Sequence, residues 1–336
     1  MLRFLPLLVL LGACGPDYVF GRQDYMDTFF QEPPAKVDIL WVVDNSPSMQ
    51  QEQEEVANRF ENFIYSFEQT NIEFHIGVIT TDMDIDNPDR ATLLGDPPVL
   101  TPAVENYRDL FVERVQVGLS GSDMERGLEA AYQAVTEPMI SDRNAGFLRS
   151  NAVLSIIIVS DENDCSDRGA LPADATNIDC YEHSEMLVPV AEYVSTFRAM
   201  RSDPSQVVGS AIVGPRRDEG CQASVPGTRY MNFAESLGGV EGNICEENFS
   251  GIMEDLGLTV SGVRASFQLT YTPVEHTIEV FVAESEKDTA EAQWTPVAES
   301  PEAGWTFDFD TRYLTFHGDS VPERGAVIHV RYDIAG

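Results

Sequence analysis

The sequence predicts an α/β fold, a doubly wound and mainly parallel sheet, followed by a small C-terminal all-β domain. In residues 36–264, nearly continuous apolar runs alternate with segments whose apolar residues recur at helical spacing. Such runs are typical of strands that are buried on both faces. After about Arg264 the helical spacing stops, and short alternating segments are separated by Gly, Pro and Asp. We therefore expect one domain over 36–264 and a second over 265–336.

The elements of the first domain follow from these two patterns. Apolar runs predict strands over 37–43, 72–80, 152–159 and 206–213. Apolar residues at helical spacing, such as Val56, Phe60 and Phe63, predict helices over 49–69, 103–115, 124–135, 185–200, 230–237 and 249–256. Strands that alternate with helices imply a mainly parallel sheet covered on both faces. In the second domain the alternating segments are 277–283, 306–309, 313–317 and 326–332.

The amino terminus predicts export. Residues 1–13 contain one Arg and an apolar run that is too short to span a bilayer, as in a secretory signal peptide. The sequence Leu-Gly-Ala before Cys14 resembles the bacterial lipoprotein box, which implies that Cys14 carries the lipid. A plain secretory signal with an incidental cysteine is the alternative. We expect residues 14–35 to form a lipidated tether, and Gly15 after the cysteine favours the outer membrane, on its periplasmic or cell-surface face.

The charge of the 336-residue chain excludes several classes of partner. It contains 21 Lys and Arg against 56 Asp and Glu, which gives a formal net charge of -35. Nucleic-acid binding relies on clustered basic residues, and only Lys36 and Lys287 are lysines. Anionic lipid headgroups are unfavourable partners for the same reason, so we expect membrane attachment by the lipid anchor only.

The remaining cysteines are Cys165, Cys180, Cys221 and Cys245, an even number in an exported chain. We expect the disulfides Cys165–Cys180 and Cys221–Cys245, because each pair brackets one irregular loop. Zinc is the competing interpretation. It is disfavoured because no two of these cysteines have the close spacing of a structural zinc site.

Three polar loops are predicted to converge at one edge of the sheet. The first strand runs into Asp44, Ser46 and Ser48, and the strand 152–159 runs into Asp161. Ser122 precedes the helix 124–135. Because the carboxyl ends of parallel strands meet at one edge, these oxygen donors are suited to a divalent cation. The alternative is that they serve only as helix caps and turn residues.

These loops, and the run VDILWVVDNSPSM that carries the first of them, resemble the Rossmann-like von Willebrand factor type A domain with its metal-ion-dependent adhesion site. The resemblance covers roughly residues 36–262. It is closest to lipoproteins of predatory and gliding bacteria, on the run GFLRSNAVLSIIIVSDENDCS. It implies Asp44, Ser46, Ser48, Ser122 and Asp161 as metal ligands, with Ser122 where the family usually has threonine.

The resemblance also implies how the site works. The cation, Mg²⁺ in the first place with Mn²⁺ and Ca²⁺ as alternatives, keeps one position open for an acidic group of a partner. A divalent ion held by few formal negative charges still attracts one more carboxylate. Further acidic residues that we expect as possible outer-shell neighbours are Asp82, Glu125, Glu162 and Asp164.

We therefore expect a lipid-anchored binding protein of the cell envelope that adheres to an acidic protein or matrix ligand. The alternative is a periplasmic scaffold or assembly factor that uses the same domain for permanent docking. An enzyme is not expected. The five histidines are scattered, and the sequence contains neither a G-x-S-x-G elbow nor a lysine after a glycine-rich loop.

Overall fold

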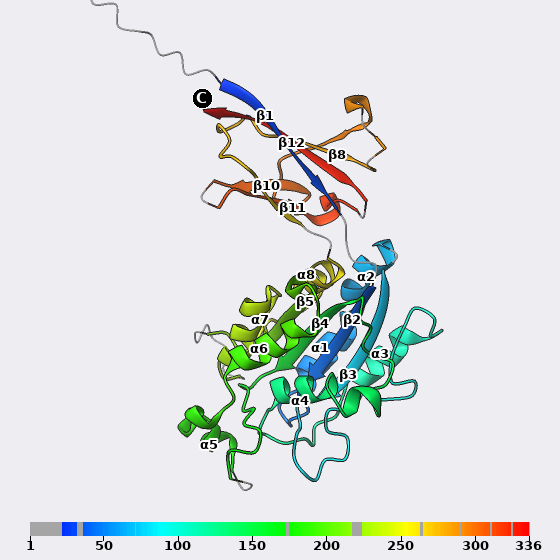
Figure 1. The fold of residues 1–336 in the computed structure, drawn as a ribbon, viewed down its shortest axis with the longest axis vertical. Helices are drawn as coiled ribbons and strands as arrows, with labels where there is room; N and C mark the ends of the chain where they lie inside the picture. The colour runs from blue at the N-terminus through cyan, green and yellow to red at the C-terminus, as the bar shows by residue number, and fades with distance from the viewer. Residues whose placement is uncertain are drawn as a thin grey trace, which may run out of the picture. The chain divides into compact units, whose positions relative to one another are not determined.

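The computed structural model describes residues 22–31, 36–70, 72–172, 175–216, 224–262, 265–285, 287–288, 290–309, 311–323 and 325–335. The predicted signal peptide, the lipidation site Cys14 and the predicted disulfide partner Cys221 lie outside the described residues. The described residues form two compact units (Figure 1). The β unit comprises the described parts of Met1–Phe29, Ser266–Ser320 and Val327–Gly336, and the parallel-sheet unit those of Phe30–Ala265 and Val321–Ala326.

The parallel-sheet unit is built on five strands in the order β3-β2-β4-β5-β6, and every neighbouring pair is parallel. The central strands are almost wholly buried because helices cover both faces. The strands are β2 (Lys36–Val43), β3 (Glu73–Thr80), β4 (Val153–Ser160), β5 (Val207–Val213) and β6 (Glu241–Asn243).

Alternate residues of β2 belong to two different cores. Trp41 and Val43 pack with side chains of α1, α2, α3 and α8, whereas Leu40 and Val42 pack with those of α4, α6 and α7. This is the period of two expected of a strand with an apolar layer on each side. The helices are α1 (Gln50–Asn58), α2 (Phe60–Thr70), α3 (Tyr107–Val115), α4 (Gly127–Ala134), α5 (Asn177–Glu182), α6 (Val190–Ala199), α7 (Thr228–Leu237) and α8 (Ser250–Ser261).

The single helix predicted over 49–69 is two helices that meet at Arg59. Each half packs against a different neighbour, α1 against α3 and α2 against α8. The second contact is close, because a Cβ atom at Gly257 would lie 2.4 Å from the carbonyl oxygen of Phe63. A periodic apolar stripe cannot reveal this break, because both halves present the same kind of face.

The β unit contains two antiparallel sheets. One has the order β1-β12-β8-β9 and the other β10-β11-β7. Phe29 of the first sheet packs against Phe267 of the second at 5.2 Å between ring centres, which starts a core between them. The strands are β1 (Arg22–Phe30), β7 (Ser266–Gln268), β8 (Glu279–Ala283), β9 (Thr295–Val297), β10 (Gly304–Asp308), β11 (Tyr313–His317) and β12 (Val327–Ala335).

The fold class predicted from the sequence was wrong for this chain. A Rossmann-like, mainly parallel fold with a small C-terminal β domain does not describe it, because two of the three sheets are antiparallel. The β unit is also not purely C-terminal, since residues 22–30, expected in a tether, form β1 beside β12. The pattern of apolar residues indicates which residues are buried, but it does not show that a strand near the start of the chain pairs with one near its end.

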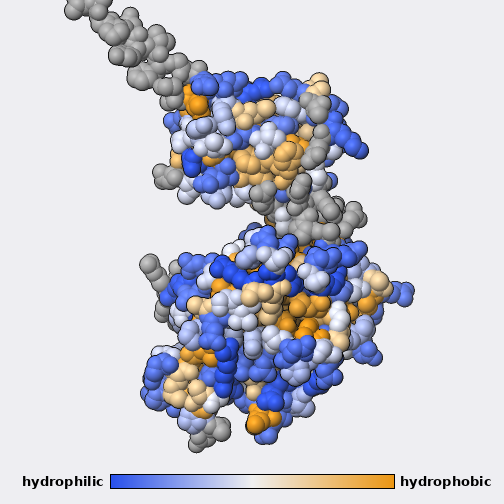
Figure 2. All heavy atoms as spheres, in the orientation of Figure 1, coloured by the Kyte–Doolittle hydropathy of each residue, from blue (hydrophilic) through white to orange (hydrophobic). Residues whose placement is uncertain are grey.

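Within the described residues, every helix is too short or too polar to cross a lipid bilayer. Figure 2 shows that the visible face of each unit is mostly hydrophilic. The acidic excess of the sequence is therefore compatible with two well-packed cores.

Candidate functional site

The polar loops that follow β2 and β4 lie side by side at the carboxyl edge of the parallel sheet. The backbone N–H of Asp44 donates to the carbonyl of Val159 at 2.9 Å, which continues the pairing of the two strands into the loops. The loop before α4 joins them, because the N–H of Gly121 donates to the carbonyl of Asn45 at 2.8 Å. A Cβ atom at Gly121 would lie 2.2 Å from Oδ1 of Asn45, so a larger residue at this position would displace the Asn45 side chain.

Asp44 is the centre of this edge and is completely buried. Its Oδ1 accepts a hydrogen bond from the N–H of Ser46 at 2.7 Å, and its Oδ2 accepts one from the hydroxyl of Ser160 at 2.6 Å. The Gln53 amide donates to the carbonyls of Asp44 and Gly118, which ties α1 to the loop. Burial, with a smaller contribution from the charge of Asp161, raises the pKa of Asp44 to about 7.

The two serines that follow Asp44 extend the site from the interior to the surface. The hydroxyl oxygens of Ser46 and Ser48 lie 3.1 Å apart, with Ser46 buried and Ser48 exposed. Ser48 also reaches the carboxylate of Asp161 and opposes the rise of its pKa. The hydroxyl of Ser122 accepts a hydrogen bond from the N–H of Met124 at 3.2 Å, as a turn residue does.

Asp161 lies beside Asp44 and is only 5 % exposed. Its Oδ1 is buried without a hydrogen-bond partner. Burial raises the pKa of this carboxyl above its ordinary value. Asp44 and Asp161 are thus two neighbouring carboxylates, withdrawn from water, whose negative charges repel one another.

Glu125 is a third buried carboxylate at this edge. It is completely inaccessible, and neither carboxylate oxygen accepts a hydrogen bond of normal geometry. Burial raises its pKa well above the ordinary value, and the charge of Asp44 raises it further. Thr81, directly after β3, is its polar neighbour, and the Thr81 hydroxyl is itself buried without a hydrogen bond of normal geometry.

The other three predicted neighbours do not share one environment. Glu162 is half-buried, and its pKa is raised by burial and by the charge of Asp161. Asp164 is engaged elsewhere, because its carboxylate accepts hydrogen bonds from Ser166, from Arg229 and from the N–H of Leu128. Asp82 accepts a hydrogen bond from the N–H of Asp84 within its own loop. Glu162 therefore belongs to the acidic edge, whereas Asp164 and Asp82 hold loops in place.

Glu52, in the first turn of α1, is a member of the edge that sequence reasoning missed. One of its carboxylate oxygens is buried without a hydrogen-bond partner, and its pKa is raised by burial and by the charge of Asp161. An acidic residue in the first turn of a helix is ordinary, because it complements the helix dipole. The available signal was its position in the sequence, in the first turn of the helix that directly follows the Asp44 loop.

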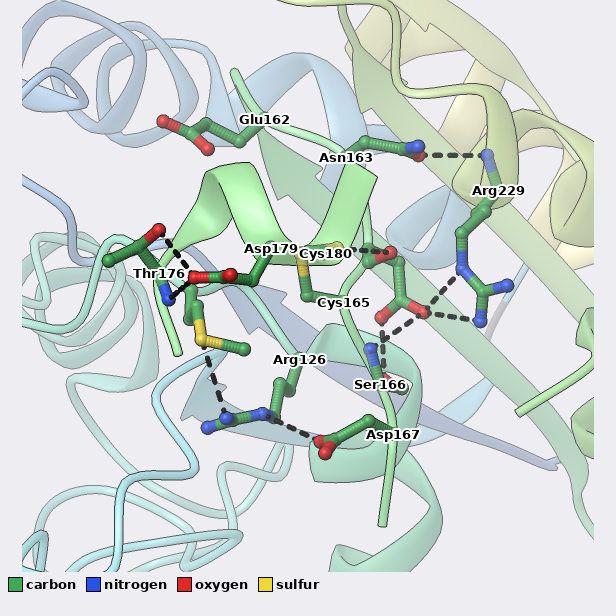
Figure 3. The surroundings of a disulfide bond; sticks show 12 residues. Arg126, Glu162, Asn163, Cys165, Ser166, Asp167, Thr176, Asp179, Cys180 and Arg229 are labelled. Carbon is green, nitrogen blue, oxygen red and sulfur yellow. Dashed lines mark hydrogen bonds and ion pairs between the residues drawn. A yellow bond between two sulfur atoms is a disulfide. The ribbon is translucent and has the colours of Figure 1, made fainter. Parts of the chain in front are cut away.

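A disulfide braces the segment that follows Asp161. Cys165 and Cys180 are bonded, one of the two pairs expected from the sequence, and Figure 3 shows this bond beside Glu162, Asn163 and Arg229. The N–H of Cys165 donates to the carbonyl of Glu125 at 2.6 Å, so the braced loop is attached to the loop before α4. Cys245 is also disulfide-bonded, and its expected partner Cys221 lies outside the described residues.

The donors at the edge suit a hard divalent cation. They are carboxylate and hydroxyl oxygens, and the buried oxygens of Asp161 and Glu125 lack the partners that buried charges require. The described residues contain no group of three or more His, Cys, Asp or Glu side chains placed to hold one metal ion. An ion at Asp44 and Asp161 would therefore depend on two carboxylates and on serine hydroxyls.

Comparison with known proteins does not place the chain in a family. No protein-family model and no curated protein matches it. Among solved structures, it is similar to the pilus adhesin SpaC from Lactobacillus rhamnosus GG, with 10% identity, a TM-score of 0.47, and coverage of 93% of this chain and 41% of that one. It is also similar to proximal thread matrix protein 1 from the mussel byssus, with 14% identity, a TM-score of 0.39, and coverage of 70% and 52%. The chain thus spans about half or less of the length of each.

Proposed function

We propose that the chain is a lipid-anchored protein of the cell envelope whose parallel-sheet unit binds a divalent cation. Its ligands are Asp44, Ser46, Ser48, Ser122 and Asp161, as the resemblance to the von Willebrand factor type A adhesion site implies. Mg²⁺ is the first candidate, with Mn²⁺ and Ca²⁺ as alternatives. The bound cation supplies an attraction for one more carboxylate, offered by another protein or a matrix. The role is adhesion or protein–protein binding, without catalysis.

The observation that carries this proposal is the pair of buried carboxylates, Asp44 and Asp161. The charged groups that raise the pKa of Asp44 and the pKa of Glu125 are other carboxylates. Burying like charges together is costly unless a cation offsets them. Ser46 and Ser48 add neutral oxygens in line from the buried carboxylates to the surface, where a partner has access.

Cation binding is tested by calorimetric titration of the purified chain with MgCl₂ and MnCl₂. We expect saturable binding in the wild type and a loss on the order of 100-fold in affinity in Asp161→Asn, because one of two charged ligands is removed. Asp142→Asn, which changes an exposed aspartate away from the edge, is the matched control and keeps the wild-type affinity. Equal binding by all three chains would overturn the proposal.

Recognition of a carboxylate is tested on two surfaces that differ only in that group, one carboxylated and one amidated. We expect attachment to the carboxylated surface in Mg²⁺, and no attachment in chelator, where a chain of charge -35 is repelled. Asp161→Asn abolishes the Mg²⁺-dependent part, which separates recognition at the site from general bridging by cations. Equal attachment to both surfaces would contradict an acidic ligand.

The lipid anchor is tested by labelling cells with a radioactive fatty acid. We expect the label in the wild-type chain and its loss in Cys14→Ser. An unlabelled wild type would leave the plain secretory signal as the explanation of residues 1–13, and a labelled Cys14→Ser chain would place the lipid at another residue.

A further inference from the structure

Glu125 is held in place by its backbone from two sides. The N–H of Cys165 donates to its carbonyl at 2.6 Å, and the N–H of the next residue, Arg126, donates to the carbonyl of Thr81 at 3.2 Å. The side chain of Glu125 is completely buried, yet both of its carboxylate oxygens lack a hydrogen-bond partner of normal geometry. A buried carboxylate in this state is costly while it is ionised, unless a cation or a proton offsets its charge.

Thr81 presents a second unsatisfied group at the same place. Its backbone is fixed, because its N–H donates to the carbonyl of Val43 at 3.2 Å. Its hydroxyl oxygen is buried and lies close to the Glu125 carboxylate, but it makes no hydrogen bond of normal geometry. A carboxylate and a hydroxyl that adjoin each other, and adjoin Asp44, form a set of hard oxygen donors.

One divalent ion does not balance the charge at this edge when all three buried carboxylates are ionised. Asp44, Asp161 and Glu125 carry three negative charges when ionised, and a single divalent ion offsets two. Among the described residues, no three acidic side chains are placed so that they could bind one metal ion together. One ion held by Asp44 and Asp161 therefore leaves Glu125 without compensation.

We propose that Glu125, Thr81 and Asp44 form a second divalent-cation site next to the one at Asp44 and Asp161. This inference rests on the proposed function, because Asp44 is shared by the two ions. Each ion then has two carboxylates and at least one hydroxyl, and water completes its coordination, as Mg²⁺ and Mn²⁺ tolerate. The second ion offsets the charge of Glu125 and leaves the first free to attract an external carboxylate.

The rival explanation is a proton in place of the second ion. In that case Glu125 is a neutral carboxylic acid that donates a hydrogen bond to Asp44. The substitution Glu125→Gln separates the two, because the amide is neutral, has nearly the same shape and keeps a donor, but is a much weaker ligand for a hard cation.

The experiment counts Mn²⁺ bound to the full chain by electron paramagnetic resonance, at about 0.15 M salt to screen weak binding to the acidic surface. We expect two tightly bound ions in the wild type and one in Glu125→Gln. Thr81→Val, which removes the hydroxyl at constant shape, weakens the second ion about tenfold. Glu254→Gln, an exposed glutamate of α8, is the matched control and retains two ions. Circular dichroism checks that each variant is folded.

Each other outcome is decisive. One ion in the wild type and one in Glu125→Gln, with equal affinity, would overturn the second site in favour of the proton. Complete loss of Mn²⁺ in Glu125→Gln would make Glu125 a ligand of a single ion and would also overturn it. Failure of the proposed function looks different, since Asp161→Asn would then leave every bound ion unaffected.

Discussion

A completely buried aspartate lies at each end of strand β2, and the charged groups around the two carboxylates have opposite signs. At the amino end, the carboxylate of Asp38 accepts hydrogen bonds from the backbone N–H of Arg149 at 2.6 Å and from its Nε at 2.7 Å. A nitrogen of Arg201 lies 3.8 Å from the same carboxylate, and so does Nδ1 of His75. At the carboxyl end, the charged neighbours of Asp44 are Asp161 and Glu125.

The difference is that the carboxylate at the amino end has basic partners within the chain, whereas the pKa shifts of the carboxylates at the other end involve no basic group of the described residues. Both aspartates lie in or next to the same strand and are completely buried, so burial alone does not explain why basic side chains of the described residues contact only Asp38. In proteins, buried polar groups that lack a partner within the chain occur mainly at functional sites. The carboxyl edge is therefore where we propose the functional site, and the comparison can be tested from both ends.

The largest effect is expected at the amino end. Asp38→Asn leaves Arg149 and the buried Arg201 without a counter-charge, which we expect to lower the free energy of unfolding by about 3–5 kcal/mol. Urea unfolding followed by circular dichroism measures it. The control Glu73→Gln changes an exposed carboxylate 3.8 Å from Arg149 and should cost under about 1 kcal/mol. A similar small cost for Asp38→Asn would remove the contrast between the two ends.

The disulfide at the carboxyl end should rank next. It closes a loop with a sequence separation of 15, so Cys165→Ala with Cys180→Ala should lower the free energy of unfolding by about 3 kcal/mol. Because the bond braces the loop whose backbone N–H at position 165 donates to the carbonyl of Glu125, Mn²⁺ affinity should fall several-fold when the bond is lost. Unfolding curves and Mn²⁺ titration measure the two effects. Unchanged affinity in the folded double variant would show that the loop keeps its place without the bond.

Titration of Asp44 gives the carboxyl end its own pH dependence. In chelator, burial raises the pKa of folded Asp44 to about 7 from 3.8, so the folded chain binds the proton more tightly than the unfolded chain. The contribution of Asp44 to the free energy of unfolding is therefore complete below about pH 4, and it is lost as the pH rises through 7. We expect a fall of about 2 kcal/mol in the free energy of unfolding between pH 5 and pH 8.

The same measurement in Mg²⁺ sharpens the comparison. A bound cation compensates the charge of Asp44, so the fall between pH 5 and pH 8 should become smaller, and in Asp44→Asn it should be smaller without any cation. Asp142→Asn serves as the control and keeps the wild-type profile in chelator. A stability that rises with pH in chelator would show that Asp44 is stabilised as an anion within the chain.

The smallest effect is expected at Ser122. Its hydroxyl is one neutral donor among several, so Ser122→Ala should weaken Mg²⁺ binding about tenfold, or 1.4 kcal/mol. The free energy of unfolding should change by less than about 0.5 kcal/mol, since only one hydrogen bond to Met124 is lost. Ser195→Ala on α6 is the control and leaves the affinity unchanged. An unaffected affinity in Ser122→Ala would remove Ser122 from the ligands.

The sequence alone determined most local elements and the membership of the Asp44 loop. The apolar run that ends at Val43 is β2, and the run before Asp161 is β4, because strands buried on both faces leave an unmistakable pattern. Adjacent parallel strands end at one edge, so Asp44, Ser46, Ser48 and Asp161 could be grouped before the structure was known.

Tertiary structure alone decided the pairing of β1 with β12, and with it the true composition of the β unit. It also decided which acidic residues share the edge: Glu52, Glu125 and Glu162 do, whereas Asp164 is bound by Arg229 and Ser166. The physical reason is common to both. Periodicity along a chain reports whether a residue is buried, but the partner of a strand edge or of a carboxylate comes from distant residues that only folding brings near.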